Sequence, residues 1–164
     1  MYFIYMLVDF VVKTQCGKKA GLMRLTLQTD YALRTLMFVA IQENICTVPM
    51  IAAHYGISRN HLIVVVHHLG KHGFLNTTRG RGGGLSLAKP AEEITLGSVV
   101  RAFESFDLVE CFRGNDDHCI ISGRCRLRHV LNRALTAWLE VLDTATLADL
   151  IDRNRGLVRL LKVG

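Results

Sequence analysis

The chain has no apolar run long enough to cross a membrane. An apolar stretch opens it at residues 1–12, but Asp9 interrupts this stretch, which falls well short of the roughly 20 residues that a transmembrane helix needs. A secretion signal places its positive charges before the apolar run, whereas here three lysines follow it and no small-residue cleavage site is clear. We therefore expect a cytoplasmic protein with no membrane partner, in which residues 1–22 are an upstream extension or a misassigned start.

Acidic residues are missing from a long central stretch. No Asp or Glu occurs from Asn44 to Ala91, although this stretch holds five of the seven histidines, and most acids lie in the second half of the chain. The same stretch contains the basic residues Arg59, Lys71, Arg79, Arg81 and Lys89. With a formal net charge of +6, this asymmetry is typical of a DNA-facing half joined to a separate sensing or dimerising half.

No catalytic constellation stands out. Seven histidines are present, but no Ser/His/Asp arrangement follows from their spacing. The glycine-rich segment 79–84 also fails the phosphate-binding patterns, because no Lys-Ser/Thr pair follows it and Leu85 stands where Gly-x-Gly-x-x-Gly needs its last glycine. We therefore expect no enzymatic activity.

Apolar spacing in the first half predicts a helix-turn-helix. A first core helix is expected over residues 27–41, with Leu33, Leu36, Met37 and Ala40 on one face. A short helix over 50–55, a turn at 56–58 and a longer helix over 59–71 then match the motif.

The longer helix is the predicted DNA-reading element. Ser58 is expected to cap it through its side-chain oxygen, which places the following residues in the first turn, where such motifs contact base edges. These residues are Arg59, Asn60 and His61. The expected inner face consists of Ile63, Val64, Val66 and Leu69.

A basic hairpin follows. Residues 74–78 and 85–88 read as two strands, and the glycines between them permit the positive φ angles of a tight turn. Arg79 and Arg81 project from its tip, as in a wing that places arginine in the narrow minor groove. The expected fold is mainly α with a small β-hairpin, a winged helix-turn-helix over residues 23–90 that binds a double-stranded operator.

The second half predicts a connecting segment and a dimerisation helix. Thr95 is expected to cap a helix over 96–103, within a connecting segment at 91–110, and a long helix is expected from about residue 125 to 142. Apolar residues on the long helix step by four, three, four and three, which predicts a homodimer seam. They are Leu127, Leu131, Ala134, Trp138 and Val141. A short helix over 147–151 completes the segment 126–152, and the tail at 153–164 carries no prediction.

Three of the five cysteines, Cys111, Cys119 and Cys125, lie in one polar, turn-rich segment at 111–125. An odd set of three thiols without an export signal favours a metal centre over a disulfide framework. The loop lacks the close Cys-x-x-Cys or His-x-x-x-His steps of structural zinc sites, so an iron–sulfur cluster is favoured over zinc. A zinc site and three unrelated thiols remain the alternatives.

Four stretches together resemble a known family. They are residues 23–34 (Met-Arg-Leu-Thr through Thr-Asp-Tyr-Ala-Leu-Arg), Ser-Arg-Asn-His-Leu at 58–62, the glycine-rich 79–85, and Cys-x7-Cys-x5-Cys-Arg-Leu-Arg at 111–128. Over residues 23 to about 152 the chain is similar to the iron–sulfur winged-helix regulators of the Rrf2 family, and within them most similar to the nitric-oxide-sensitive repressors.

This resemblance implies a cluster held by Cys111, Cys119 and Cys125, with Asp30 from the other subunit as the fourth ligand of a 4Fe–4S centre. A different branch of the family uses a histidine three residues after the last cysteine, where this chain has Arg128, with His129 one step away. Because seven residues separate Cys111 from Cys119, a longer spacing than in some relatives, a 2Fe–2S cluster is the alternative. For Asp30 the commoner role is an acid that the helix dipole favours near a helix start.

The resemblance further implies a repressor that releases DNA when nitric oxide reaches its cluster, so that nitric oxide detoxification genes are expressed. The alternatives are an iron-responsive or redox-responsive regulator of the same family, a redox iron–sulfur protein that does not bind DNA, and a zinc-stabilised binding module.

Overall fold

A computed structural model of the chain describes residues 24–42, 44–80, 82–109, 112, 119–121, 124–152 and 154–162. The predicted N-terminal extension, the wing residue Arg81 and the predicted ligand Cys111 lie outside these ranges.

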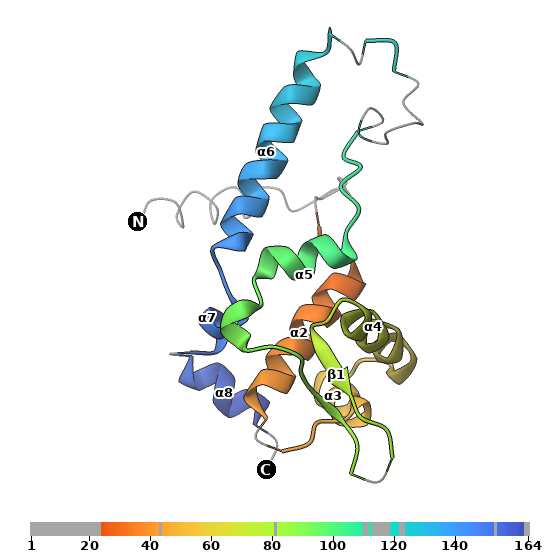
Figure 1. Cartoon of the computed structure of the whole chain (residues 1–164), viewed down its shortest axis with the longest axis vertical. Coiled ribbons are helices and arrows are strands. Elements are labelled where there is room, and N and C mark those ends of the chain that lie inside the picture. Colours follow the sequence, from red (N-terminus) through yellow and green to blue (C-terminus); the bar gives the residue numbers. More distant parts are fainter. Residues whose placement is uncertain are drawn as a thin grey trace, which may run out of the picture.

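The described part of the chain is mainly helical with one two-stranded sheet, which confirms the predicted fold class (Figure 1). Its elements are α2 (Leu27–Ile41), α3 (Val48–Tyr55), α4 (Arg59–Lys71), β1 (Leu75–Thr77), β2 (Leu85–Leu87), η1 (Ala91–Glu93), α5 (Leu96–Phe103), α6 (Arg126–Asp143), α7 (Leu147–Ile151) and α8 (Arg155–Leu161). None of these helices is both long and apolar enough to span a membrane.

Helix α2 forms the centre of the core. Thr26 is its N-cap, and the threonine side chain accepts a hydrogen bond from the backbone N–H of Thr29. Leu36 and Phe38 on α2 are completely buried, and α2 packs against α4, α5, α7 and α8. Burying a side chain of this size contributes roughly 1.5–3 kcal/mol, so α2 fixes the positions of the elements around it.

The helix-turn-helix has the predicted order. Pro49 stands in the first turn of α3, where its missing N–H costs no helical hydrogen bond. Gly56 ends α3 with φ 63°, a left-handed conformation that glycine adopts without strain, and the chain then turns into α4.

The wing is the hairpin of β1 and β2, which pair antiparallel with Leu75 opposite Leu87 and Thr77 opposite Leu85. Leu85 also donates its backbone N–H to the carbonyl of Cys46 at 2.7 Å, which ties the hairpin to the segment between α2 and α3. A side chain at Gly83 would collide with the carbonyl oxygen of Thr78. The hairpin therefore closes only because this position lacks a Cβ.

Helix α6 extends from the compact body, with its N-terminal end far from the wing (Figure 1). Its C-terminal end is fixed by a bidentate ion pair between Arg101 of α5 and Asp143, with N···O distances of 2.5 and 2.6 Å. The hydrogen bond from Arg101 lowers the pKa of Asp143, since it stabilises the charged carboxylate. The base of α6 is thus held to α5.

The tail contains α8 (Arg155–Leu161), a helix that was not predicted. Leu161 is buried in the core, and the side-chain amide of Gln42 donates to the carbonyl oxygen of Leu161 at 2.6 Å. Helix α7 before it begins with a reciprocal capping box between Thr146 and Asp149. Both C-terminal helices therefore pack against α2.

Candidate DNA interface and cluster-binding segment

Helix α4 presents its first turn to solvent. Arg59, Asn60 and His61 are all exposed, as a turn that contacts base edges must be. Leu62 and Leu69 are fully buried on the opposite side and hold α4 against the core. The structure thus places the three predicted reading residues together on one turn.

The predicted cap of α4 is wrong in one respect. Ser58 is the N-cap residue, but its side chain makes no capping hydrogen bond. The threonine caps that do make one, Thr26, Thr95 and Thr146, have ψ between 147° and 166°, whereas Ser58 has ψ 130°. Ser58 is exposed beside the reading residues.

The predicted inner face of α4 is also partly wrong. Ile63 and Val64 are 53% and 55% exposed, while Leu62, Val65, Val66 and Leu69 are buried. The buried set follows the i, i+3, i+4, i+7 spacing of one helix face, and the run of aliphatic residues at 62–66 concealed this register. Two aliphatic side chains therefore lie on the outer surface of the reading helix.

A groove of about 240 Å³ joins α4 to the start of α2. It is lined by Leu27, Gln28, Tyr31, His61, Val64 and Val65. Tyr31 directly follows Asp30, so the turn that carries the predicted fourth ligand shares this groove with the predicted DNA-reading residue His61.

At the wing, Arg79 is exposed beside the glycines that close the hairpin. Gly80 and Gly82 have φ of 99° and 82°, which confirms the positive angles expected of this loop. Gly84 has no room for a side chain either, since a Cβ there would collide with the side chain of Ile45. Arg79 is therefore carried on a hairpin with a fixed backbone.

Two of the three predicted cysteine ligands are described. Cys119 and Cys125 are partly buried, and Cys125 is the N-cap residue of α6. Cys46 differs from both because it is buried and desolvation raises the pKa of its thiol to about 11, which keeps it protonated. Among the described cysteines, Cys125 therefore lies at the start of α6 and Cys119 in the segment before it, whereas Cys46 lies in the core.

Asp30 lies in the first turn of α2. Its carboxylate forms a bidentate ion pair with Arg34, with both N···O distances at 2.9 Å. The side chains of Asp30 and Arg34 are 38% and 44% exposed, so the carboxylate is reachable from outside the protomer. Within one protomer, the described residues bring no three His, Cys, Asp or Glu side chains into one metal-binding group.

Glu104, at the end of α5, is a residue that sequence reasoning missed. Its carboxylate accepts hydrogen bonds from the backbone N–H of Thr26, at 2.7 Å, and from the hydroxyl of Thr29. It thereby ties the start of α2, and with it the turn of Asp30, to the chain that leads into the cysteine segment. No local pattern marks it, because its partners lie 78 and 75 residues away in the sequence.

Residues 25–153 match the model of the Rrf2 family, described as an iron-dependent transcriptional regulator. Two similar proteins are the HTH-type transcriptional regulators NsrR of Bacillus subtilis (46% identical over 144 residues, 86% of this chain and 99% of that protein) and Bacillus licheniformis (48% over 142 residues, 85% and 99%).

Among solved structures, the chain is similar to oxidised Staphylococcus aureus CymR, with a TM-score of 0.63 and 26% identity over 79% of this chain and 97% of that one. It is also similar to T. potens IscR, with a TM-score of 0.62 and 25% identity over 83% and 90% of the two chains.

Proposed function

The chain belongs to the Rrf2 family of transcriptional regulators, and from this premise we propose that it is a homodimeric, cytoplasmic repressor of the NsrR type whose iron–sulfur cluster senses nitric oxide. One observation carries the proposal: the α2 turn with Asp30 shares a groove with the α4 turn with His61. The predicted fourth ligand therefore lies one residue from Tyr31, which lines this groove together with the predicted DNA-reading residue His61.

DNA binding is supported by the charge and exposure of the first half. The exposed first turn of α4 carries Arg59, Asn60 and His61, and the wing carries Arg79 and, outside the described residues, Arg81. Arginine and asparagine side chains read guanine and adenine edges in the major groove, and exposed aliphatic side chains such as Ile63 contact the thymine methyl. Ser58, free of a capping bond, has its hydroxyl available for a phosphate.

Helix α6 has two apolar sides, and the exposed one supports dimerisation. Leu131 and Trp138 are partly buried, and Trp138 lies edge-on to Phe106 of its own protomer, with ring centroids 6.3 Å apart. A second apolar side is exposed, and its members step by three, four, three and four residues. They are Leu127, Val130, Ala134, Ala137 and Val141.

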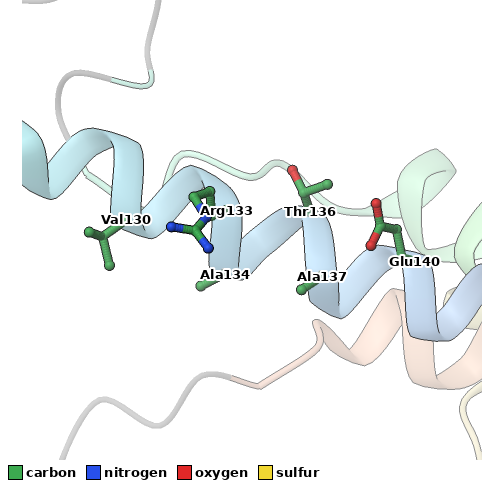
Figure 2. Close-up of a pocket in the computed structure, with 6 residues that line it drawn as sticks. All are labelled: Val130, Arg133, Ala134, Thr136, Ala137 and Glu140. Carbon is green, nitrogen blue, oxygen red and sulfur yellow. The ribbon is translucent and has the colours of Figure 1, made fainter.

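An open groove of about 600 Å³ runs along the exposed side (Figure 2). In Figure 2, Val130, Ala134 and Ala137 follow one another along α6, with Arg133 and Glu140 at the margin. Small residues flanked by charge suit close approach of a second helix. We propose that α6 of a second copy occupies this groove, so that Leu127, Ala134 and Val141 of the predicted seam contact it directly.

The donor set suits an iron–sulfur cluster. We propose Cys111, Cys119 and Cys125 as thiolate ligands and Asp30 of the second subunit as the fourth, in a 4Fe–4S centre with 2Fe–2S as the alternative. When bound, the cluster supplies iron that reacts with nitric oxide. To bind a cluster, the carboxylate of Asp30 would have to leave its ion pair with Arg34. Because Arg34 competes for this carboxylate, Asp30 would be a ligand that is readily released.

Release of Asp30 then acts on DNA binding. The carboxylate returns to Arg34 and the cross-subunit tie is lost, so the two protomers can rotate about α6. Two recognition helices must enter successive major grooves about 34–36 Å apart, and a small rotation removes base contacts on one half-site.

An anaerobic titration tests this function. The probe is a duplex selected from a random library against the anaerobically purified dimer, and cluster absorbance and duplex binding are followed together as nitric oxide is added. We expect binding to be lost at a few molecules of nitric oxide per cluster, before an iron chelator in a parallel sample has any effect.

Other outcomes identify the alternatives. Binding that survives nitric oxide but disappears on mild iron depletion would indicate an iron-responsive regulator. A coloured protein that binds no duplex would indicate a redox iron–sulfur protein, and a colourless protein with one tightly held zinc would indicate a zinc-stabilised module. Binding that is indifferent to both treatments would exclude the sensor.

A further inference from the structure

Two histidines lie one helical turn apart near the end of α4. His68 and His72 have their Nε2 atoms 3.3 Å apart and their ring centroids 4.7 Å apart. They form the His-x-x-x-His step that the cysteine segment lacks, in the geometry by which residues i and i+4 meet on a helix surface.

The separation of the two ring nitrogens suits a metal ion. Zinc binds histidine nitrogen at about 2.0–2.1 Å in tetrahedral sites, and two such ligands spread by a tetrahedral angle lie roughly 3.3–3.4 Å apart. The Nε2 atoms already stand at this distance. We propose that His68 and His72 form a second metal site, which binds a divalent transition-metal ion such as Zn²⁺ through two imidazoles, with water in the remaining positions.

One of the two rings is already fixed. His68 is partly buried and lies edge-on to Phe103 of α5, with centroids 4.6 Å apart, so chelation has to order only the exposed His72. Desolvation lowers the pKa of His68, and the nearby His72, Lys71 and His67 lower it further. A neutral imidazole is the form that binds metal, so His68 is ready to bind at neutral pH.

Two protein ligands set the character of the site. No group of three or more His, Cys, Asp or Glu side chains gathers within the described part of the chain, so the bound ion keeps open positions. Such a site resembles a regulatory or exchangeable site more than a closed structural one. The ion would clip together the last turns of the recognition helix where they meet α5.

The rival explanation is a plain hydrogen bond, in which one neutral imidazole donates its Nε2 proton to the other. Both explanations fit the same distance. They differ in what happens when metal is added, because only in a chelating pair do both ring nitrogens bind the added ion.

The test is a titration of the full-length, cluster-loaded dimer with Zn²⁺ by anaerobic calorimetry in a non-chelating buffer. Cluster absorbance is recorded throughout and must stay constant, which shows that zinc does not enter the cysteine segment. The variants are His68→Gln and His72→Gln, and the matched control is His67→Gln, a neighbouring exposed histidine on α4.

We expect one zinc per protomer in the wild type and in the His67 control, and at least tenfold weaker binding in the two pair variants. The thermal midpoint should rise with zinc only where the pair is intact, because the ion binds the native helix. Nitrogen NMR of the wild type should show both Nε2 signals moving together. Equal zinc affinity in all four proteins, or no zinc binding by the wild type, would overturn the proposal.

Discussion

The carboxylate of Glu104 accepts a hydrogen bond from the hydroxyl of Thr29, a residue that is fully buried in α2. It also accepts one from the backbone N–H of Thr26. Because Glu104 ends α5 and Asp30 directly follows Thr29, this contact joins the chain leading into the cysteine segment to the turn that carries the predicted fourth ligand.

Two buried threonines of α2 should therefore respond in opposite ways to the same substitution. Thr29→Val removes a donor to a carboxylate and should lower the free energy of unfolding by about 1.5–3 kcal/mol. Thr35→Val should raise it by about 1 kcal/mol, because the hydroxyl of Thr35 is buried and has no hydrogen-bond partner among the described residues. Threonine and valine have similar helix propensity, so urea unfolding of both variants isolates the hydrogen bond. Equal losses in both would contradict the assignment.

Gly97 of α5 tests the clamp at the base of α6. A Cβ at Gly97 would collide with the carboxylate of Asp143 and lie 2.8 Å from Nη1 of Arg101, so Gly97→Ala must displace their ion pair. Alanine is otherwise favoured over glycine in a helix by roughly 0.5–1 kcal/mol. We expect Gly97→Ala to be stabilising in an Asp143→Ala background and neutral or destabilising in the wild type. A double-mutant cycle by chemical unfolding measures the difference, and additive effects would show that the pair does not hold α6.

Gly83 should be essential to the wing but not to the core. Gly83→Ala forces its side chain against the backbone of Thr78, whereas Gly156→Ala in α8 meets only the side chain of Asn154 at 3.8 Å and is the matched control. We expect Gly83→Ala to weaken duplex binding with little loss of helical circular dichroism.

Arg79→Ala should reduce the salt dependence of binding by about one phosphate charge. Wild-type affinity and salt slope in both variants would remove the wing from the interface.

Local signals explain why much of the fold could be predicted. Helices α2, α4, α5 and α7 begin and end where apolar spacing, the glycine turn before α4 and the cap of α5 at Thr95 placed them. Helix α8 could not be predicted in this way, because a short helix is stabilised by tertiary contacts such as that between Gln42 and Leu161. The aliphatic run in α4 was ambiguous for a related reason: Ile63 and Val64 differ from Leu62 in direction but not in composition.

The same distinction between local and tertiary signals applies to the candidate site. The reading residues of α4 and the glycines of the wing are marked by neighbours in the sequence. The structure exposes the first and gives Gly80 and Gly82 the expected positive φ angles. Glu104 and the pairing of Arg101 with Asp143 depend on residues that only folding brings together. The role of Asp30 came from family resemblance, and its ion pair with Arg34 became visible only in the structure.

The exposed side of α6 should carry the dimer contact. Ala134→Asp places a charge in the middle of the groove and should shift the protein towards monomer (Figure 2). Asn132→Asp, at an exposed position of α6 that does not line this groove, is the control and should not. Ala134 is a cleaner probe than Trp138, which also packs against Phe106 of its own protomer. Sedimentation equilibrium of the cluster-loaded proteins measures the change. A dimer that withstands Ala134→Asp would place the interface elsewhere.

Asp30 and Arg34 provide a matched pair that separates a ligand from a helix-start acid. If Asp30 only forms an exposed i, i+4 pair and interacts with the helix dipole, Asp30→Asn and Arg34→Gln should each cost about 0.3–1 kcal/mol or less, and the cluster should behave alike in both. If Asp30 is a cluster ligand, Asp30→Asn should speed the loss of cluster absorbance to an iron chelator. Arg34→Gln should slow it, because this change removes the competitor for the carboxylate and keeps the carboxylate itself.

The same two variants should respond to nitric oxide in opposite directions, with less needed to release the duplex from Asp30→Asn and more from Arg34→Gln. Indistinguishable chelator kinetics and nitric oxide responses in the two variants would defeat the ligand assignment, while their unfolding free energies would still report the ion pair.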